Sequence, residues 1–287
     1  MQNKTILITG GSFGIGLQTA KILAKKGATI YIVGRNAEKT IQAVEETKTD
    51  SGNNQVDFFI ADLSSQKQIR KLAEEIKAKL GRLDVLINNA GGVSQTLQFT
   101  EDNIELTFAT NHLSYFLLTN LLLDLLKRSA PARIVCVSSN SHYPGRIDFN
   151  DLNMTNKYWG MAAYECSKVC NVLFTMELAE RLKGSGITVN ALHPGKVKTA
   201  IGLKNTGFLY KIVWKLATTF LAISVEKGAE TSIYLASSKE VENITGKYFS
   251  DCKEKIPSAY SQTPRLKEKL WEVSERLTSL SMAKYQL

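Results

Sequence analysis

The chain has 287 residues, of which 44% are apolar and 22% are charged, and its formal net charge is +9. This length suits one large α/β domain or two small ones, and the composition excludes a largely disordered chain. The positive charge is compatible with a phosphorylated cofactor, a nucleic acid or an anionic membrane, but basic residues are scattered and never exceed a pair, so we expect a solvated basic surface.

Cysteine usage indicates the redox compartment. The chain has 4 cysteines, Cys136, Cys166, Cys170 and Cys252, and none follows the CxxC spacing. We therefore expect reduced thiols in a cytoplasmic protein. We expect no metal site, because neither a histidine nor a second cysteine pair accompanies Cys166 and Cys170. The start, which runs from Met1 into an apolar strand within a few residues, is unlike a signal peptide.

Residues 5–9 predict a buried strand, followed by a glycine-rich turn at 10–16 and a helix over 17–26. Glycines allow a tight turn and let the backbone approach a pyrophosphate, whose charge the start of the helix would hold. The glycine spacing is G-x-x-x-G-x-G, which differs from the G-x-G-x-x-G fingerprint. The strand before the turn and the helix after it favour nucleotide binding over a purely structural turn.

Residues 28–33 predict a second strand, which ends before Arg35, Asn36 and a polar helix that runs to about residue 50. The residues after this strand usually contact the ribose of a bound dinucleotide. An acidic residue there would bind the 2′-hydroxyl of NAD, whereas the guanidinium of Arg35 suits the 2′-phosphate of NADP. We therefore predict NADP (NADPH), with a solvated surface arginine as the alternative.

Residues 56–60 predict a third strand and 65–80 a helix, with Ser64 or Ser65 as its N-cap. Asp62 lies between these two elements. It is placed either to meet an adenine amino group or to act as a carboxylate at the start of the helix.

Two further strands are predicted at residues 84–87 and 133–137, each followed by small polar residues at the edge where ligands bind in open α/β sheets. These residues are Asn88-Asn89-Ala90-Gly91 and Ser138-Ser139. Between the two strands, 101–127 predicts one long helix that is apolar in its second half. Asn111 within it must find partners for its amide, either a bound water or the chain itself.

Residues 161–182 show helical spacing of apolar residues and contain Tyr164 and Lys168. Residues four apart lie on one face of a helix. A cation within about 4 to 6 Å favours the phenolate, so the pair predicts an acid or base tyrosine whose pKa is lowered toward neutrality by Lys168. From these residues alone, an amphipathic helix that carries the pair by chance is an equal alternative.

Residues 186–192 predict a sixth strand, followed by His193-Pro194-Gly195, and 245–249 predict a seventh. Strand and helix alternate along the chain without repeats or low-complexity linkers. The sequence therefore predicts the α/β class, with a doubly wound parallel sheet of about seven strands flanked by helices.

The motifs stand in one order along the chain: Thr9-Gly10-x-x-x-Gly14-Ile15-Gly16, Asn88-Asn89-Ala90-Gly91, Asn111, Ser139, Tyr164-x-x-x-Lys168 and Pro194-Gly195. This order resembles the short-chain dehydrogenase/reductase family over residues 5–199. The resemblance implies a Rossmann-type fold and an NADP-dependent oxidoreductase. Such an enzyme moves a hydride between the nicotinamide and a carbonyl or alcohol carbon.

The resemblance also implies the roles of the site residues. Tyr164 would be the general acid in reduction and the base in oxidation, and Lys168 would bind the nicotinamide ribose and lower the pKa of Tyr164. Ser139, with Ser138 as its rival, would hydrogen-bond the substrate oxygen, and Asn111 would hold a water that connects Lys168 to solvent. The implied cofactor-binding residues are Gly10, Ser12, Phe13, Gly14, Ile15, Gly16, Arg35, Asn36, Asp62, Leu63, Asn89, Ala90, Gly91, Tyr164, Lys168, Pro194, Val197 and Thr199.

Finer features are similar to the retinol dehydrogenases, in particular Asn111-His112-Leu113 and the stretches 171–175 and 270–274. They imply an enzyme that interconverts an apolar alcohol and its aldehyde or ketone. Residues 168–171 are also similar to the light-dependent protochlorophyllide reductases, so a double-bond reductase is one alternative. A non-catalytic NADP-binding scaffold is another, because fold does not imply function.

A hydrolase that would use Ser139, His142 and Asp148 is disfavoured, because no G-x-S-x-G elbow surrounds the serine.

We expect a single domain over residues 1–287, in which 200–225 covers the substrate cleft and 250–287 forms a C-terminal helical extension. The apolar stretch 208–223 is interrupted by lysines and is shorter than the roughly 20 residues of a membrane span. Contact with a membrane surface and plain core packing are its two open interpretations. The resemblance implies a dimer or tetramer through the two long helices, and we expect no nucleic-acid partner.

Overall fold

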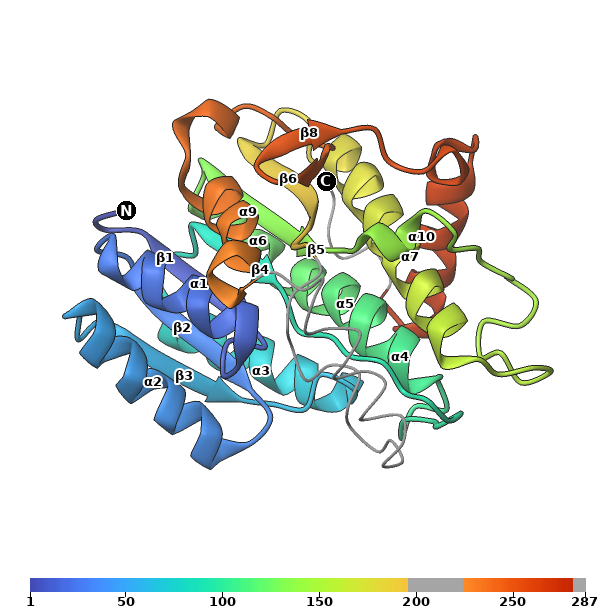
Figure 1. Cartoon of the computed structure of the whole chain (residues 1–287), viewed down its shortest axis with the longest axis horizontal. Coiled ribbons are helices and arrows are strands. Elements are labelled where there is room, and N and C mark those ends of the chain that lie inside the picture. Colours follow the sequence, from blue (N-terminus) through green and yellow to red (C-terminus); the bar gives the residue numbers. More distant parts are fainter. Residues whose placement is uncertain (196–223, 281–287) are drawn as a thin grey trace.

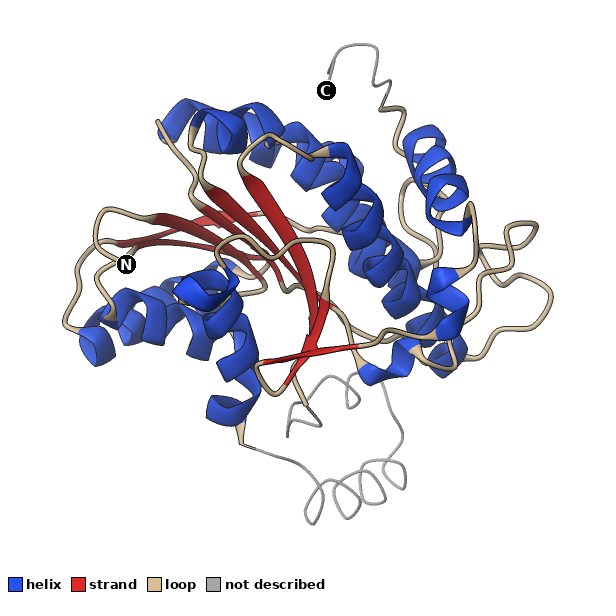
Figure 2. Ribbon diagram, turned by 90° about the horizontal axis from the view of Figure 1, so that it is seen from above, coloured by secondary structure: helices blue, strands red, loops and turns tan. Residues whose placement is uncertain are grey.

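The computed structural model describes residues 1–195 and 224–280, which form one sheet of 8 strands covered by helices on both faces (Figures 1 and 2). The strand order is β3-β2-β1-β4-β5-β6-β7-β8, and within it β8 pairs antiparallel with β7 while the other pairs are parallel. The strands are β1 Thr5–Thr9, β2 Thr29–Gly34, β3 Val56–Ile60, β4 Val85–Asn88, β5 Ala132–Val137, β6 Ile187–His193, β7 Tyr248–Ser250 and β8 Lys253–Lys255. The predicted doubly wound parallel sheet is confirmed.

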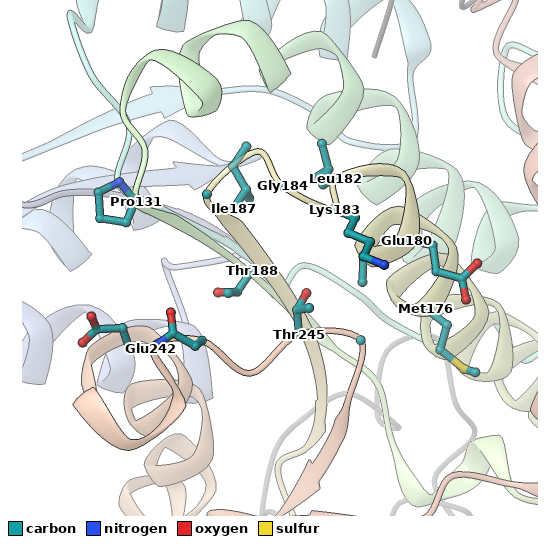
Figure 3. Close-up of a pocket in the computed structure, with 14 residues that line it drawn as sticks. Pro131, Met176, Glu180, Leu182, Lys183, Gly184, Ile187, Thr188, Glu242 and Thr245 are labelled. Carbon is teal, nitrogen blue, oxygen red and sulfur yellow. The ribbon is translucent and has the colours of Figure 1, made fainter.

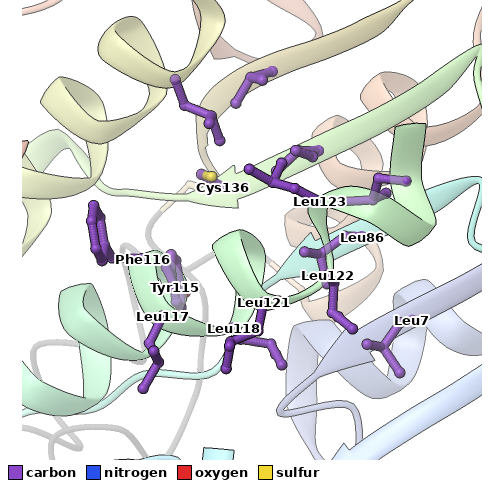
Figure 4. Packing of buried hydrophobic residues seen from close by; sticks show 14 of the residues in the cluster. Leu7, Leu86, Tyr115, Phe116, Leu117, Leu118, Leu121, Leu122, Leu123 and Cys136 are labelled. Atoms are coloured by element: carbon purple, nitrogen blue, oxygen red, sulfur yellow. The ribbon is translucent and has the colours of Figure 1, made fainter. Parts of the chain in front are cut away.

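The helices divide between the two faces because the strands are apolar on both sides, and alternate residues of a strand point to opposite faces. Ile6 and Ile8 of β1 belong to a core cluster with residues of α1, α2 and α9. Leu7 belongs to a cluster on the other face with residues of α3, α5, α6 and α7 (Figure 4). The helices are α1 Gly14–Lys25, α2 Ala37–Ser51, α3 Gln66–Lys79, α4 Leu106–Phe108, η1 Ala109–Leu113, α5 Ser114–Leu121, α6 Leu123–Arg128, η2 Asn140–His142, α7 Gly160–Arg181, α9 Val225–Ser237, η4 Lys239–Val241, η5 Ala259–Gln262 and α10 Leu266–Leu277.

The strand order reverses between β1 and β4, because the chain builds β2 and β3 on one side of β1 and then continues on the other. In open α/β sheets, such a reversal leaves a crevice beyond the carboxyl ends of the strands, where ligands bind. The glycine-rich turn follows β1, Asn89-Ala90-Gly91 follows β4 and Ser138-Ser139 follows β5. The topology thus gathers these three segments at one edge of the sheet.

Helix α10 packs along α7 and closes the core over α5. The indole of Trp271 stacks on Phe174 at 6.0 Å and meets Phe116 edge-on at 4.8 Å, and the guanidinium of Arg181 lies over it. Every residue of α5 is buried within this one chain. Trp271 of α10 thus covers part of α5 and α7. The dimer or tetramer through the two long helices stays a prediction.

The prediction of one helix over residues 101–127 was wrong at its start and in its continuity. The helical segment begins at Leu106, because the side chain of Glu105 accepts hydrogen bonds from the amides of Thr107 and Phe108. The segment then passes through the π-helical turn η1 and is divided at Leu122 between α5 and α6. Local apolar spacing does not show these breaks, since they depend on where side chains find partners.

Three smaller boundaries also differ from prediction. β7 begins at Tyr248 instead of residue 245, and the short antiparallel β8 was not predicted. Ser65, one of the two candidate caps of α3, accepts a hydrogen bond from the amide of Gln68, whereas Ser64 hydrogen-bonds Asp62.

Among residues 1–195 and 224–280, no helix combines the length and the apolar content needed to cross a membrane. The stretch 208–223, for which we left membrane contact and core packing open, lies outside the described residues.

The packing of α10 predicts that Trp271→Ala destabilises the protein by about 3–5 kcal/mol, since the substitution leaves a cavity between α5, α7 and α10. At about 2–4 °C per kcal/mol for a chain of this size, a thermal scan should show Tm falling by at least about 6 °C. Trp159→Ala is the matched control, because Trp159 is 61% exposed. A similar loss of Tm in both variants would contradict the proposed anchoring of α10.

Candidate active site

The glycine-rich turn between β1 and α1 forms a cradle of backbone. Gly10 and Gly14 have φ of +65° and +56°, a region that favours glycine. A Cβ on Gly16 would lie 2.4 Å from the carbonyl oxygen of Gly10, so only glycine fits there. Phe13 is the N-cap of α1, yet its side chain makes no capping bond and is 61% exposed. The amides at the start of α1 are thus left without a side-chain cap, as a phosphate site requires.

Thr9 and Asn89 tie this turn to the end of β4. The Thr9 hydroxyl accepts hydrogen bonds from the amides of Asn89 and Ala90 at 2.9 and 3.0 Å. The Asn89 side chain donates to the carbonyls of Thr9 and Gly10 at 2.9 and 3.2 Å. The sequence analysis did not assign Thr9 a site role. Only the pairing of β1 with β4 brings its hydroxyl to the neighbouring strand.

The candidate ribose and adenine residues lie at the ends of β2 and β3. Arg35, whose side chain is 65% exposed, contacts Asp62 over 3.4 Å. Asp62 also accepts hydrogen bonds from the amide and hydroxyl of Ser64, as expected of a carboxylate near the start of α3. Asn36 caps α2 by accepting from the amide of Lys39, and the side chain of Leu63 belongs to the hydrophobic core. Asn36 and Leu63 thus have structural side-chain roles that the sequence analysis did not predict.

Tyr164, Lys168 and Ser139 meet where α7 passes the end of β5. Lys168 Nζ lies 5.4 Å from the centre of the Tyr164 ring and donates to the carbonyl oxygen of Val137 at 3.0 Å. The Ser139 hydroxyl interacts with the Tyr164 phenol. The rival, Ser138, is buried and donates its hydroxyl proton to the backbone carbonyl of Lys168 at 2.7 Å. The geometry therefore separates the two serines: Ser139 faces the phenol, whereas Ser138 fastens α7 to β5.

Burial controls the protonation of this cluster. It lowers the pKa of Lys168 to about 8. It also raises the pKa of Tyr164 above its ordinary value, against the opposing effect of Ser139. We expected Lys168 to lower the pKa of Tyr164, but the net direction is upward. The physical reason is that desolvation of the phenolate dominates, while the ammonium is directed at the carbonyl of Val137.

Asn111 lies in the π-helical turn η1 and anchors the loop after β4. Its amide donates to the carbonyl of Gly92 and to the hydroxyl of Ser167, both at 2.9 Å, and its oxygen accepts from the amide of Gly92 at 2.8 Å. A Cβ on Gly91 would approach Asn111 Oδ1 to 3.1 Å and Lys168 Nζ to 3.6 Å. Both donors of the Asn111 amide are thus engaged by the protein, and the bound water that the family resemblance implied stays a prediction.

Glu105 and Tyr158 brace the loops beside this cluster, and sequence reasoning missed both. The buried carboxylate of Glu105 accepts from the Tyr158 hydroxyl at 3.0 Å, and the same hydroxyl donates to the carbonyl of Ser94 at 2.9 Å. Burial raises the pKa of Tyr158 to about 12, so it remains a donor. An acidic residue just before an apolar helical run was the one available signal, because carboxylates stabilise the positive end of a helix.

His142 is not oriented as a base for Ser139. Its Nδ1 lies 2.7 Å from the backbone carbonyl of Ser139, and its Nε2 accepts from the amide of Ser258 at 3.1 Å. Both ring nitrogens are therefore engaged with the backbone. Asp148 accepts from the amide of Asn150 in its own loop. The hydrolase alternative thus has no geometric support.

The remaining candidate residues are quickly placed. Pro194 follows β6, whose last residue, His193, accepts a hydrogen bond from the amide of Asn140. Val197, Thr199 and the segment 200–223 lie outside the described residues. Within the described part of the chain, no cluster of three or more His, Cys, Asp or Glu side chains is arranged to hold a metal. The thiols of Cys166 and Cys170 are buried.

A cavity of about 510 Å³ lies elsewhere, at the amino edge of the sheet (Figure 3). It is lined by the end of α7, including Glu180 and Lys183, by the start of β6 at Ile187 and by the loop that carries Glu242 and Thr245. Because parallel strands share their direction, this cavity opens on the edge opposite Tyr164.

Comparisons with known proteins agree on one family. Residues 4–206 match the family model described as short chain dehydrogenase. Human retinol dehydrogenase 13 is 44% identical, over 96% of this chain and 85% of that protein, and mouse retinol dehydrogenase 12 is 43% identical over 96% and 87%. An uncharacterized protein from Mycobacterium paratuberculosis superimposes with a TM-score of 0.78 at 31% identity, covering 97% of this chain and 94% of that one. A short chain dehydrogenase from Burkholderia cenocepacia, solved in complex with NADP, gives 0.67 at 26% identity, covering 86% and 96%.

The crowded glycine turn predicts that Gly16→Ala lowers the free energy of unfolding by about 1–3 kcal/mol. The new methyl group would push Gly10 and Asn89 away from the start of α1. The expected fall in Tm is about 2–6 °C. Gly81→Ala is the matched control, since a Cβ there meets no atom within 4 Å. Equal Tm values for the two variants would show that the turn relaxes without cost.

Proposed function

This chain belongs to the short-chain dehydrogenase/reductase family, and on that premise we propose that it is an NADP(H)-dependent oxidoreductase that interconverts an apolar alcohol and its aldehyde or ketone. The observation that carries the proposal is the meeting of Ser139, Tyr164 and Lys168 at the carboxyl edge of the sheet. A scaffold protein that only binds the nucleotide has no need of all three.

The residues at this edge fit a dinucleotide. The uncapped start of α1 and the close backbone of Gly10 and Gly16 suit a pyrophosphate. In the proposal, Arg35 holds the 2′-phosphate, while Lys168 binds the nicotinamide ribose through its ammonium. NADPH bound in this way would supply a hydride to the carbonyl carbon of the substrate.

The protein's own part in the reaction is to deliver a proton. In reduction, Tyr164 gives its phenolic proton to the substrate oxygen as the carbonyl carbon gains the hydride, and Ser139 donates a hydrogen bond to the same oxygen. In oxidation, both transfers run in reverse. Because burial raises the pKa of Tyr164, the phenol keeps its proton at neutral pH. The protonated phenol is the form that acts as the general acid in reduction.

Arg35 supports the choice of NADP over NAD. It is an exposed cation at the end of β2, the position from which side chains contact the ribose. Its partner Asp62 is held by Ser64 at the start of α3, so the guanidinium can exchange Asp62 for a phosphate without moving the backbone. The Burkholderia relative in complex with NADP supports the same choice.

The relatives support the proposed substrate class. Retinol dehydrogenases 11 to 14 are 40–44% identical to this chain over 96–98% of its length. We propose a substrate with an apolar chain or ring next to its carbonyl, such as retinal or a medium-chain aldehyde.

Replacement of the proton donor provides the first test. We expect purified Tyr164→Phe to reduce retinal and aliphatic aldehydes with NADPH about 100- to 10,000-fold more slowly than wild type, since the phenol is the proton source. Tyr31→Phe, which removes a hydroxyl that contacts none of these groups, should keep full activity. Equal background rates in wild type and Tyr164→Phe would favour the scaffold alternative, whereas high rates in both would assign the proton to another group.

Loss of the proposed phosphate ligand provides the second test. Arg35→Ala should raise KM for NADPH about 10- to 100-fold and leave KM for NADH unchanged, because a hydrogen bond to a charged group contributes about 1.5–3 kcal/mol. Arg128→Ala, on the far side of the sheet at the end of α6, controls for the loss of one positive charge. An equal effect on both cofactors would contradict the role of Arg35 in choosing NADP.

A further inference from the structure

The carbonyl oxygen of Val137, at the end of β5, receives two side chains of α7. Lys168 Nζ donates to it at 3.0 Å and Asn171 Nδ2 at 3.3 Å. A carbonyl oxygen has two lone pairs and accepts both. Residues three apart on a helix share a face, and Asn171 is fully buried on this one. Asn171 and Lys168 therefore donate to the same carbonyl oxygen, that of Val137.

The other end of the Asn171 amide faces His112. Asn171 Oδ1 and His112 Nδ1 are both buried without a hydrogen-bond partner. The two side chains are neighbours, since Asn171 acts to raise the pKa of His112 against burial, which lowers it to about 3. Buried polar atoms nearly always find partners, so two such atoms on neighbouring side chains form a natural donor and acceptor pair.

The remaining ring nitrogen of His112 reaches α10. His112 Nε2 lies 2.9 Å from the hydroxyl oxygen of Ser274, which also lies 2.8 Å from the carbonyl of Leu270. A neutral imidazole has one donor and one acceptor. Ser274 has one hydroxyl proton, which is directed at the Leu270 carbonyl in this rotamer. If the hydroxyl turns and donates to Nε2 instead, the ring proton sits on Nδ1 and can be donated to Asn171 Oδ1. Each link then has one proton, and both unpartnered atoms are satisfied.

We propose that Asn171 and His112 are positioning residues for the proposed reaction, in a buried hydrogen-bonded chain that runs from Ser274 through His112 and Asn171 to the carbonyl of Val137 and so fixes Lys168. The inference rests on the proposed function, in which Lys168 binds the cofactor beside Tyr164. It makes α10, which lies beyond the 4–206 segment matched by the family model, part of the support of the site.

The π-helical turn η1 gives the chain a second effect. Asn111 and His112 are neighbours in this turn, and both are fully buried. Asn111 holds the loop at Gly92 and the hydroxyl of Ser167, while His112 points to Asn171 and Ser274. Since π-helical turns insert one residue into a helix, they place successive side chains where a regular helix would not, and they are frequent at functional sites. A displaced His112 would therefore also disturb Asn111.

The tautomer of His112 tests the chain without any turnover. In protein labelled with ¹⁵N-histidine, the His112 signals are those lost in His112→Gln. We expect the wild-type ring to be protonated on Nδ1 at neutral pH and to move toward the Nε2-protonated form in Asn171→Leu, which has no acceptor. A wild-type ring protonated on Nε2 would overturn the proposed chain.

Kinetics test the positioning role. Asn171→Leu and Ser274→Ala should lower kcat, in Asn171→Leu by about tenfold, which corresponds to about 1.4 kcal/mol. The pH of half-maximal alcohol oxidation should shift in both, because displacement of the Lys168 ammonium from the Val137 carbonyl changes the electrostatic field at the Tyr164 phenol. Ser274→Thr keeps the hydroxyl and should restore the wild-type profile.

Thr278→Val is the matched control on α10, because the Thr278 hydroxyl bonds only carbonyls of its own helix, those of Ser274 and Glu275. It should lower Tm without a change in the pH profile. A wild-type kcat and pH profile in Asn171→Leu would overturn the positioning role even if the tautomer is as expected. If the wild-type protein turns over no carbonyl, the proposed function fails and the positioning role with it, whereas the histidine signals still show whether the chain of hydrogen bonds exists.

Discussion

The attachment of α7 to the end of β5 is the constraint on which the candidate site depends. The hydroxyl of Ser138 donates to the backbone of Lys168, and the ammonium of Lys168 donates to the carbonyl of Val137. These reciprocal bonds fix the helix at one height along the strand. Ser139, two residues beyond the end of the strand, then comes opposite Tyr164. A shift of α7 by one turn would separate the three side chains, although each would remain in its own element.

The same burial that holds these residues in place also sets their charge. Desolvation lowers the pKa of Lys168 and raises the pKa of Tyr164, so both are displaced toward their neutral forms. The Tyr164 phenol, with its proton retained, is suited to donate that proton when the substrate oxygen becomes negative. The lowered pKa of Lys168 leaves its ammonium less strongly charged on average. Farther along α7, Trp271 of α10 packs on Phe174 and meets Phe116 of α5, which joins the three helices.

Much of the fold was predictable, because the strands of a sheet buried on both faces are continuous apolar runs bounded by glycine and polar residues. The runs at Thr5–Thr9 and Val56–Ile60 coincide with β1 and β3. The helix after β4 was not predictable in detail. Its start depends on the carboxylate of Glu105. Its π-helical segment places both Asn111 and His112 in the protein interior. These features arise from partners that lie far away in sequence, so no local spacing reveals them.

The sequence by itself determined which chemistry-bearing residues stand at strand ends and that Tyr164 and Lys168 share a helix face, because both follow from the fixed periods of strands and helices. Only the tertiary structure decided between Ser138 and Ser139, reversed the expected direction of the Tyr164 pKa, and engaged Asn111 with Gly92 and Ser167. The physical reason is that hydrogen-bond partners and desolvation depend on which segments meet in space. Those meetings are set by the packing of the whole chain and not by any one stretch of it.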